Sequence, residues 1–265
     1  MAQNSRLSVT AIIPTHLRDE LLKRAIQSVV DQDFPPLEII VVDDTSSSDT
    51  RSIVKAFDKN SPMDVIYMER TNYKESSSPA SINMAAESAR GNVLAILDDD
   101  DYWAKNYLST VIDQLDGEPA DFVVTAMTYF NEKGETWNGK LLPDDYDKRD
   151  WLVRNPGMGC SNLVIRRDVF LDVGGFDGRL FVSGDRDLFM RLMKFGARLH
   201  INKNRQVLIQ KFDIGLSRGK PWRMIKSNLR LYRKYALQMP IDLHYRNWVK
   251  FLGYTKAGLL SKTDD

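Results

Sequence analysis

The stretch VLAILDDDDYW, residues 93–103, decides the fold of this chain. It begins with five apolar residues, as a buried strand does, and four consecutive aspartates, Asp98 to Asp101, follow directly. Ligands bind where the strands of a parallel sheet end, so these acids emerge at a ligand site. Four neighbouring carboxylates raise one another's pKa unless a hard cation such as Mg²⁺ or Mn²⁺ neutralises them. An isolated acidic run is usually a hydrated turn, but its place at a strand end favours a metal site.

The residues before this stretch alternate between strand and helix patterns. We expect strands at 9–13, 37–42 and 65–68, and helices at 19–31, from 47–49 to about 58, and at 80–89, the last one stopped by Gly91. This β-α-β-α-β order with short links predicts an α/β fold with a Rossmann-like, doubly wound and mainly parallel sheet. Such a sheet holds a nucleotide at the carboxyl ends of its strands.

Length and composition fit one α/β domain with a C-terminal elaboration, because 265 residues with 43% hydrophobic content can bury a substantial core. No run of about 18 uninterrupted apolar residues occurs, and no signal-peptide core precedes the first expected strand. We therefore expect a cytoplasmic protein, soluble or peripheral at the inner face of the cell membrane. The single cysteine, Cys160, excludes an internal disulfide framework and is expected to be structural. The three histidines are too scattered in sequence to indicate a zinc site.

The C-terminal part of the chain is strongly basic. Between residues 218 and 256, ten lysines and arginines face one acid, Asp242, although the whole chain has a formal net charge of only +1. Aromatic and aliphatic residues alternate with these bases, as they do in a helix that lies on an anionic membrane surface. A nucleic-acid patch has a similar composition, but no nucleic-acid partner is expected. A pair of amphipathic helices that packs on the domain is an equally good interpretation.

Four ordered motifs resemble those of the inverting glycosyltransferases of family 2. They are VTAIIPT at 9–15, AIQSV at 25–29 with Gln32, EIIVVDDTS at 38–46, and LDDDDYW at 97–103. The resemblance covers about residues 7–200 and fades beyond Gln210. It implies the nucleotide-diphospho-sugar transferase fold called GT-A.

The resemblance also implies a division of the chain. A GT-A domain at 1–210 would have its nucleotide-binding half at about 7–103 and its acceptor-binding half at about 104–210. Residues 211–265 would form a basic, amphipathic helical extension.

Individual residues take roles from the same resemblance. Contacts with the nucleotide sugar are implied for Pro14, Thr15, His16, Arg18, Asp43, Asp44, Asn83, Asp98 and Asp99. Asp44 is expected to read the base, whereas Asp43 could instead be an acid that stabilises a turn. Asp100 is expected to bind the metal, Mn²⁺ or Mg²⁺, directly. Asp98 is expected at the metal too, and Asp98 or Asp99 would reach the ribose or a metal-bound water.

A second acidic motif, SGDRDLFMRL at residues 183–192, carries the expected general base. The family reads Glu-Asp-x-Asp-Leu-x-x-Arg-Leu here, and alignment on the Asp-Leu pair places the base on Asp185. An inverting transfer needs one carboxylate to take the proton of the acceptor hydroxyl. Asp187 is therefore interpreted as structural. Asp101 could bind the metal or cap a helix that begins near Ala104, and the cap is the preferred interpretation.

The acceptor is expected beside this base and along the small-residue stretch 155–161. The resemblance implies acceptor-side positions at Trp151, Gly157, Met158 and Gly184, and Gly184 stands where the family has Glu. Glycine permits close backbone approach to a sugar. Trp137 or Trp151 could stack on a sugar, or each could simply pack.

Two further positions depart from the family pattern. Ile82 stands where the family often has an arginine aimed at the diphosphate, and Lys74 or Arg70 is the candidate replacement. The family's late histidine, sometimes a metal ligand, has no clear counterpart. Asp213 could replace it, or could be a surface acid.

These features predict a metal-dependent inverting glycosyltransferase of the hexosyltransferase type. It would move a sugar from a nucleotide diphosphate, with UDP as the expected carrier, to a hydroxyl of a glycan or lipid-linked glycan, as in surface polysaccharide biosynthesis. Two alternatives stay open. One is a nucleotidyltransferase or phosphohydrolase that uses strand-end aspartates, and the other is a non-catalytic scaffold that binds a sugar nucleotide.

Overall fold

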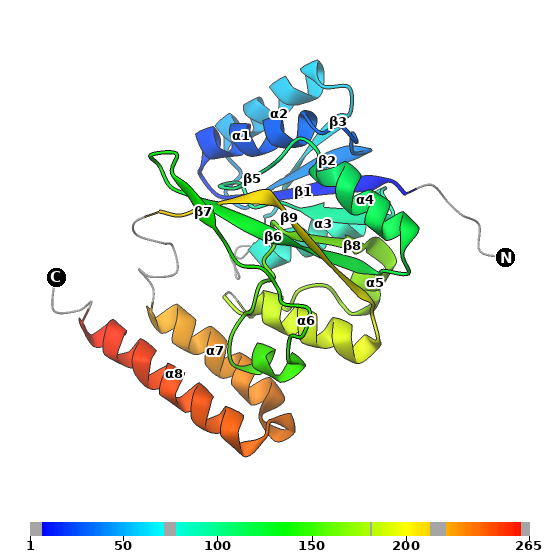
Figure 1. Cartoon of the computed structure of the whole chain (residues 1–265). Coiled ribbons are helices and arrows are strands. Elements are labelled where there is room, and N and C mark those ends of the chain that lie inside the picture. The colour runs from blue at the N-terminus through cyan, green and yellow to red at the C-terminus, as the bar shows by residue number, and fades with distance from the viewer. Residues whose placement is uncertain (1–6, 72–77, 181, 213–220, 261–265) are drawn as a thin grey trace.

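The computed structural model describes residues 7–71, 78–180, 182–212 and 221–260. Its centre is a nine-stranded sheet with the strand order β3-β2-β1-β4-β8-β6-β9-β5, in which β7 also pairs with β6 (Figure 1). The strands are β1 (Val9–Thr15), β2 (Glu38–Asp43), β3 (Asp64–Glu69), β4 (Val93–Ile96), β5 (Tyr102–Trp103), β6 (Phe122–Phe130), β7 (Thr136–Asn138), β8 (Leu163–Arg166) and β9 (Leu199–Gln210).

The N-terminal half of the sheet is parallel. β1 pairs in parallel with β2 and β4, and β2 pairs in parallel with β3, which confirms the predicted order. β1 continues through Pro14 to Thr15, two residues beyond the expected end. The other half is mixed, because β8 is antiparallel to both β4 and β6 while β6 and β9 are parallel. The doubly wound parallel arrangement therefore holds for the first half only.

Helices cover both faces of the sheet. They are α1 (Asp19–Val30), α2 (Ser48–Asn60), α3 (Ser78–Ser88), α4 (Tyr107–Gly117), α5 (Arg167–Asp172) and α6 (Gly184–Phe195). One hydrophobic cluster joins the sheet to α1, α2 and α4, and a second joins it to α3, α5 and α6. Figure 1 shows these helices on either side of the strands.

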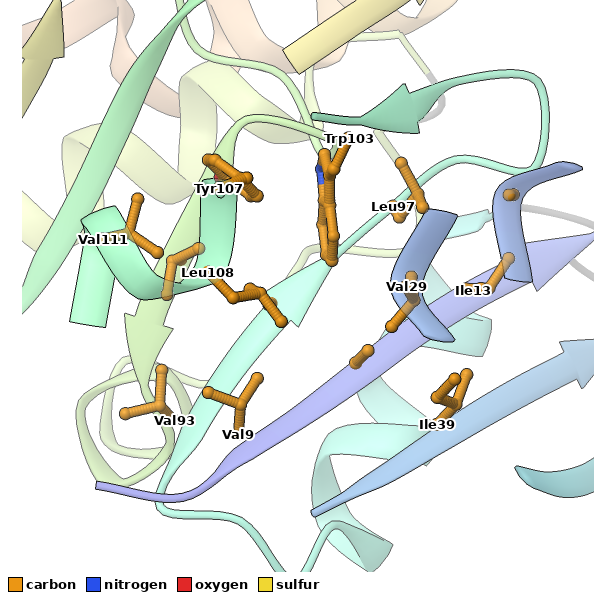
Figure 2. Close-up of a cluster of buried hydrophobic side chains, with 14 of the residues drawn as sticks. Val9, Ile13, Val29, Ile39, Val93, Leu97, Trp103, Tyr107, Leu108 and Val111 are labelled. Atoms are coloured by element: carbon orange, nitrogen blue, oxygen red, sulfur yellow. The ribbon is translucent and has the colours of Figure 1, made fainter. Parts of the chain in front are cut away.

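The strands supply both clusters because their side chains alternate between the two faces. Within β1, Val9, Ala11 and Ile13 belong to the first cluster and Ile12 to the second. Figure 2 shows Val9 and Ile13 on the face that also carries Val29 of α1. This burial on both faces explains why the strands are almost continuously apolar.

Local sequence fixes the ends of several elements. Ser47, one of the three candidates at 47–49, caps α2, and its hydroxyl oxygen accepts a hydrogen bond from the backbone N–H of Thr50 at 3.3 Å. Gly91 precedes β4 where the chain passes close to β1. A Cβ atom at this position would lie 2.6 Å from the backbone nitrogen of Thr10, so only glycine fits.

The structure corrects the expectation for Asp101. Tyr102 and Trp103 form β5, which pairs with β9, and α4 begins only at Tyr107 with Asn106 in the cap position. Asp101 therefore does not cap this helix. Its carboxylate instead accepts hydrogen bonds from the Ser161 hydroxyl at 2.5 Å and the Gln210 backbone N–H at 2.9 Å.

The C-terminal part forms two long helices, α7 (Pro221–Tyr235) and α8 (Ile241–Leu260), joined by the short 3-10 helix η3 (Ala236–Gln238). Figure 1 shows α7 and α8 side by side next to α6. A third hydrophobic cluster holds them against the 3-10 helix η2 (Lys148–Leu152); it contains Leu152, Val153, Leu180, Leu231, Tyr235, Met239 and Leu243. The packing interpretation of this segment therefore describes its inner face. Among the helices that the structure describes, none combines the length and apolar character needed to cross a bilayer.

Candidate active site

The acidic run lies at the carboxyl end of β4, as the sequence predicts. Asp98, Asp100 and Asp101 each place a carboxylate oxygen within 4.8 Å of the others. Burial, with repulsion from Asp100 and Asp99, raises the pKa of Asp98 to about 7. Burial, with repulsion from Asp100 and Asp98, also raises the pKa of Asp101. A divalent cation would offset this repulsion, so the oxygen cluster fits Mn²⁺ or Mg²⁺ and includes Asp101, which the sequence had assigned elsewhere.

Asp99 points away from this cluster and binds the loop after β1. Its carboxylate is fully buried and accepts a hydrogen bond from the Thr15 hydroxyl at 2.7 Å. The Arg18 guanidinium forms an ion pair with Asp99 and donates to Asp100 at 2.6 Å. Burial is the main cause that raises the pKa of Asp99 to about 6, and Arg18 opposes it. Arg18 thus brings positive charge to the rim of the acidic run.

Asp44 lies at the end of β2 beside two basic side chains. Nδ1 of His16 is 2.6 Å from one carboxylate oxygen of Asp44, and Nη2 of Arg70 is 3.7 Å from the other. The His16 ring is exposed, whereas Asp44 and Arg70 are buried. The structure therefore brings together residues that the sequence assigned to the nucleotide.

Asp43 performs a different task from its neighbour. Its two carboxylate oxygens accept hydrogen bonds from Thr45, from the Ser47 backbone N–H at 2.7 Å and from the Tyr67 hydroxyl at 2.9 Å. All of these donors belong to the adjoining loop or to β3, and Asp43 is fully buried. This environment corresponds to the turn-stabilising alternative rather than to a nucleotide contact.

The loops after β1 and β2 both contain a left-handed residue that is not glycine. Leu17 has φ 52° and Ser46 has φ 58°. Such conformations cost of order 1 kcal/mol and cluster at ligand sites. Both residues lie in loops that follow strand ends, Leu17 beside His16 and Arg18, and Ser46 two residues after Asp44.

Asp185 lies in the first turn of α6 with both carboxylate oxygens held. The side-chain amide of Asn155 donates to Oδ2, and the Arg186 backbone N–H donates to Oδ1 at 2.8 Å. Asn155 also accepts from the backbone N–H groups of Gly157 and Met158 at 2.9 and 3.0 Å, so it orders the loop that faces the acid. Burial raises the pKa of Asp185 despite these hydrogen bonds. The role of Asn155 was missed in the sequence, where an Asn-Pro-Gly turn was its only signal.

The two acidic sites border one region of the protein. Burial raises the pKa of the Cys160 thiol well above its ordinary value, and the negative charges of Asp98, Asp185 and Asp101 raise it further. Cys160 thus lies within electrostatic reach of both sites, although their sequence positions are far apart. Hydrogen bonds show the same link, because Asn155 donates to Asp185 at one end of the stretch 155–161 and the Ser161 hydroxyl donates to Asp101 at the other.

Asp187 has a structural environment, as the sequence interpretation proposed. It is fully buried and accepts hydrogen bonds from Arg191 at 2.8 Å and from the Tyr235 hydroxyl at 2.8 Å. Lys234 adds an ion pair at 2.6 Å. Asp187 therefore connects α6 to α7.

Two residues that were predicted to contact the nucleotide sugar or the acceptor, Asn83 and Trp151, bind other parts of the protein instead. The Asn83 amide exchanges two hydrogen bonds of 2.8 Å with the backbone of Phe176, so it fixes a turn rather than facing a ligand. Trp151 is fully buried and stacks on Phe189 with 3.6 Å between the ring centroids, so its ring cannot stack on a sugar. Trp137 of β7 is 44% exposed, so its ring is accessible to stack on a sugar.

The small acceptor-side residues are closely packed. A Cβ atom on Gly157 would lie 2.8 Å from the Leu142 backbone nitrogen, Met158 is buried, and Gly184 is buried against Phe176 and Pro79. Ile82 is part of the core, and Arg70 stands beside Asp44. Lys74 and Asp213 lie outside the described residues.

The arrangement of sheet, helices and strand-end acids is that of a GT-A fold. Superposition on the crystal structure of *S. aureus* TarS gives a TM-score of 0.66 over 94% of this chain and 43% of that chain, at 18% sequence identity. The fold alone does not assign a family, but the sequence does. The model of glycosyl transferase family 2 matches residues 10–174, more than half of the chain, and the chain belongs to that family.

Two relatives show how far the similarity extends. A *Campylobacter jejuni* GalNAc(5)-diNAcBac-PP-undecaprenol beta-1,3-glucosyltransferase is 34% identical over 148 residues, which are 55% of this chain and 47% of the relative. The *Escherichia coli* enzyme WfgD, a UDP-Glc:alpha-D-GlcNAc-diphosphoundecaprenol beta-1,3-glucosyltransferase, is 28% identical over 159 residues, 60% of each chain. The matches thus span less than two thirds of either relative.

Proposed function

We propose that the protein transfers a sugar from a nucleotide-diphosphate donor to a hydroxyl of a glycan acceptor, with inversion at the anomeric carbon. The observation that carries this proposal is that the stretch 155–161 contacts both acidic sites, because the Asn155 side-chain amide donates to Asp185 and the Ser161 hydroxyl donates to Asp101. A reaction with inversion needs a leaving-group site and a base on opposite sides of the reacting carbon. In the proposed reaction, the acids at the end of β4 would serve the leaving group and Asp185 would be the base.

The donor would bind across the carboxyl ends of β1, β2 and β4. Asp44, with His16 beside it, would accept hydrogen bonds from the base, and Asp99 would hold Thr15 and Arg18 around the diphosphate. Asp98, Asp100 and Asp101 would hold Mn²⁺ or Mg²⁺. Such an ion, when bound, offsets the charge that grows on the departing nucleoside diphosphate.

Asp185 would act as the general base. Its carboxylate would accept the proton of the acceptor hydroxyl while that oxygen attacks the anomeric carbon from the face opposite the phosphate. Burial raises its pKa, and a more basic carboxylate is a better proton acceptor. Asn155 and the Arg186 backbone N–H would keep the carboxylate oriented.

The names of the relatives support a particular donor and acceptor. The *E. coli* relative uses UDP-Glc, and both relatives act on acceptors carried on diphospho-undecaprenol. We therefore propose UDP as the carrier and a lipid-linked glycan of surface polysaccharide biosynthesis as the acceptor, reached at the cytoplasmic face of the membrane. Trp137 is exposed on β7 and would be the aromatic residue that stacks on the acceptor.

A hydrolysis assay with UDP-glucose, UDP-GlcNAc and GDP-mannose tests the proposal, with water in place of the acceptor. We expect a UDP-sugar to be cleaved only when Mn²⁺ or Mg²⁺ is added, with UDP and free sugar as products. Release of UMP and sugar phosphate would instead identify a phosphohydrolase. Tight binding of the nucleotide sugar without cleavage would support the scaffold alternative.

The outer face of α8 supports contact with a membrane. It carries exposed apolar side chains at helical spacing, Ile241, Tyr245, Trp248, Val249 and Leu252, and Leu237 of η3 is exposed as well. Exposed bases of α7, including Lys226 and Arg233, lie on the neighbouring helix. An exposed apolar stripe and exposed positive charge are each features that favour binding to an anionic lipid surface.

We predict that the protein sediments with anionic liposomes at low salt and is released at high salt. Each base near such a surface contributes about 1 kcal/mol, and salt screens this attraction. The variants K226Q/R233Q and W248S/L252S should both lower sedimentation and keep donor hydrolysis, whereas K55Q/K59Q on α2 should match the parent. Lys234 is unsuitable for this test because it pairs with the buried Asp187. Failure of the parent to sediment at low salt would remove the membrane from the proposal.

A further inference from the structure

Lys250 lies on the inner face of α8, although a charged side chain is expected on the outer, solvent-facing side. Leu243, Asn247 and Phe251 share that face and are buried. A lysine that is largely removed from water needs partners, because burial of an ammonium group without them is costly. Burial, with repulsion from Arg186, lowers the pKa of Lys250 to about 7, while attraction to Asp185 opposes this shift.

Lys250 finds its partners near the active site. Its ammonium group donates to the backbone carbonyl of Val153 at 2.7 Å and to the side-chain oxygen of Asn228 at 3.0 Å. The same oxygen of Asn228 accepts from Nη1 of Arg186 at 2.8 Å. Nε of Arg186 donates to the carbonyl of Trp151 at 2.7 Å. α7 and α8 are thus joined by a polar network to η2 and α6.

This network supports both groups that hold Asp185. Asn155, which donates to Oδ2, follows Val153 by two residues in the segment that Lys250 binds. Arg186, whose backbone N–H donates to Oδ1, has its side chain fixed by Asn228. The C-terminal helices thus contact both the segment that leads to Asn155 and the side chain of Arg186.

We propose that Lys250 is a positioning residue for Asp185, and that α7 and α8 complete the active site through Lys250 and Asn228. The inference rests on the proposed role of Asp185 as the base. A helix pair that served only as a cap would pack better with apolar residues, since buried charged groups rarely add stability over well-packed hydrophobic ones. In this proposal the polar network is present because it orients the carboxylate of Asp185.

The variant K250M tests the proposal, because methionine keeps the aliphatic part of the lysine side chain and removes the ammonium group. With the UDP-sugar cleaved by the parent, we expect kcat of hydrolysis to fall by up to about 10²-fold, because a catalytic group displaced by about 1 Å can cost that much. KM and the affinity for UDP with Mn²⁺ should change less than about twofold, since the donor side is untouched. The acidic limb of the kcat profile should move to higher pH, because Asp185 loses one neighbouring cation while Arg186 and Lys140 remain.

R246M is the matched control. Arg246 is also on α8, but its ion pair with Asp150, 3.2 Å long, is at the surface. This variant should keep the kcat and the pH profile of the parent, since exposed pairs contribute little. Equal kcat and pH profiles in K250M and R246M would overturn the proposal.

Hydrogen exchange gives a readout that needs no activity. In K250M, amides of residues 153–158 and of the first turn of α6 should exchange faster than in R246M, while those of β1 and β2 stay unchanged. Equal exchange in the two variants would contradict the positioning role of Lys250, even if the parent cleaves no nucleotide sugar. Should K250M not fold, N228A removes the shared acceptor instead, and it must show the same local exchange and kcat loss while K250R retains the parental values.

Discussion

The variant D185N is expected to lose donor hydrolysis and sugar transfer by about 10²-fold or more, while its affinity for UDP stays within a few-fold. Asparagine keeps the shape of the side chain and can still bind near Asn155, but it cannot take a proton. Calorimetry for UDP and a hydrolysis assay for the donor separate these two effects.

Asp187 provides the comparison for this experiment. It is two residues away but fully buried, with Arg191, Tyr235 and Lys234 around it. D187N should therefore lower the melting temperature, because it weakens the link between α6 and α7. A D185N protein with nearly parental hydrolysis would show that Asp185 is not the base.

The residues at strand ends are the part of the site that sequence could place. An apolar run that stops at an acid fixes both the strand and the end at which the acid emerges, as Asp44 and Asp98 show. The helices of the first half follow from apolar periodicity and from caps such as Ser47. These signals are local, and the parallel half of the sheet follows from them.

The wrong predictions for Asn83, Trp151 and Asp101 have a different physical origin. Whether Asn83 or Trp151 faces a ligand depends on what packs against it, and Phe176 and Phe189 come from distant parts of the chain. Asp101 was misplaced because β5, which has only two residues, is defined by its pairing with β9. None of these partners is indicated by a local pattern.

The contacts around the base are the hardest to infer from sequence. Asn155 is 30 residues from Asp185, and Lys250 is 97 residues from Val153. Composition correctly indicated basic, amphipathic helices, yet it could not show that one lysine turns inward while Trp248 and Leu252 remain exposed. A binary pattern of apolar and polar residues places Lys250 on the wrong side of its helix.

The second large effect is expected for D100A, which should weaken binding of UDP in the presence of Mn²⁺ by about 10²-fold or more. Changes that only perturb the surroundings of a metal ligand typically cost 10–100-fold in metal affinity, and this change would remove a ligand itself. Calorimetry of UDP with and without Mn²⁺ measures the effect. D113A, which removes an exposed acid of α4, is the control and should bind as the parent does.

The pH dependence of the same binding provides an independent check on the cluster. Asp98 has a pKa of about 7, so it gains a proton as the pH falls from 8 to 5, and the pKa of Asp101 in the same cluster is raised as well. A protonated carboxyl group is a poor cation ligand, so protons compete with the metal, and the affinity for Mn²⁺ should decrease toward low pH. Bound metal favours the ionised form, so the midpoint should fall below 7. If D100A keeps the full Mn²⁺-dependent affinity for UDP and the parent shows no such pH dependence, the metal does not bind at the end of β4.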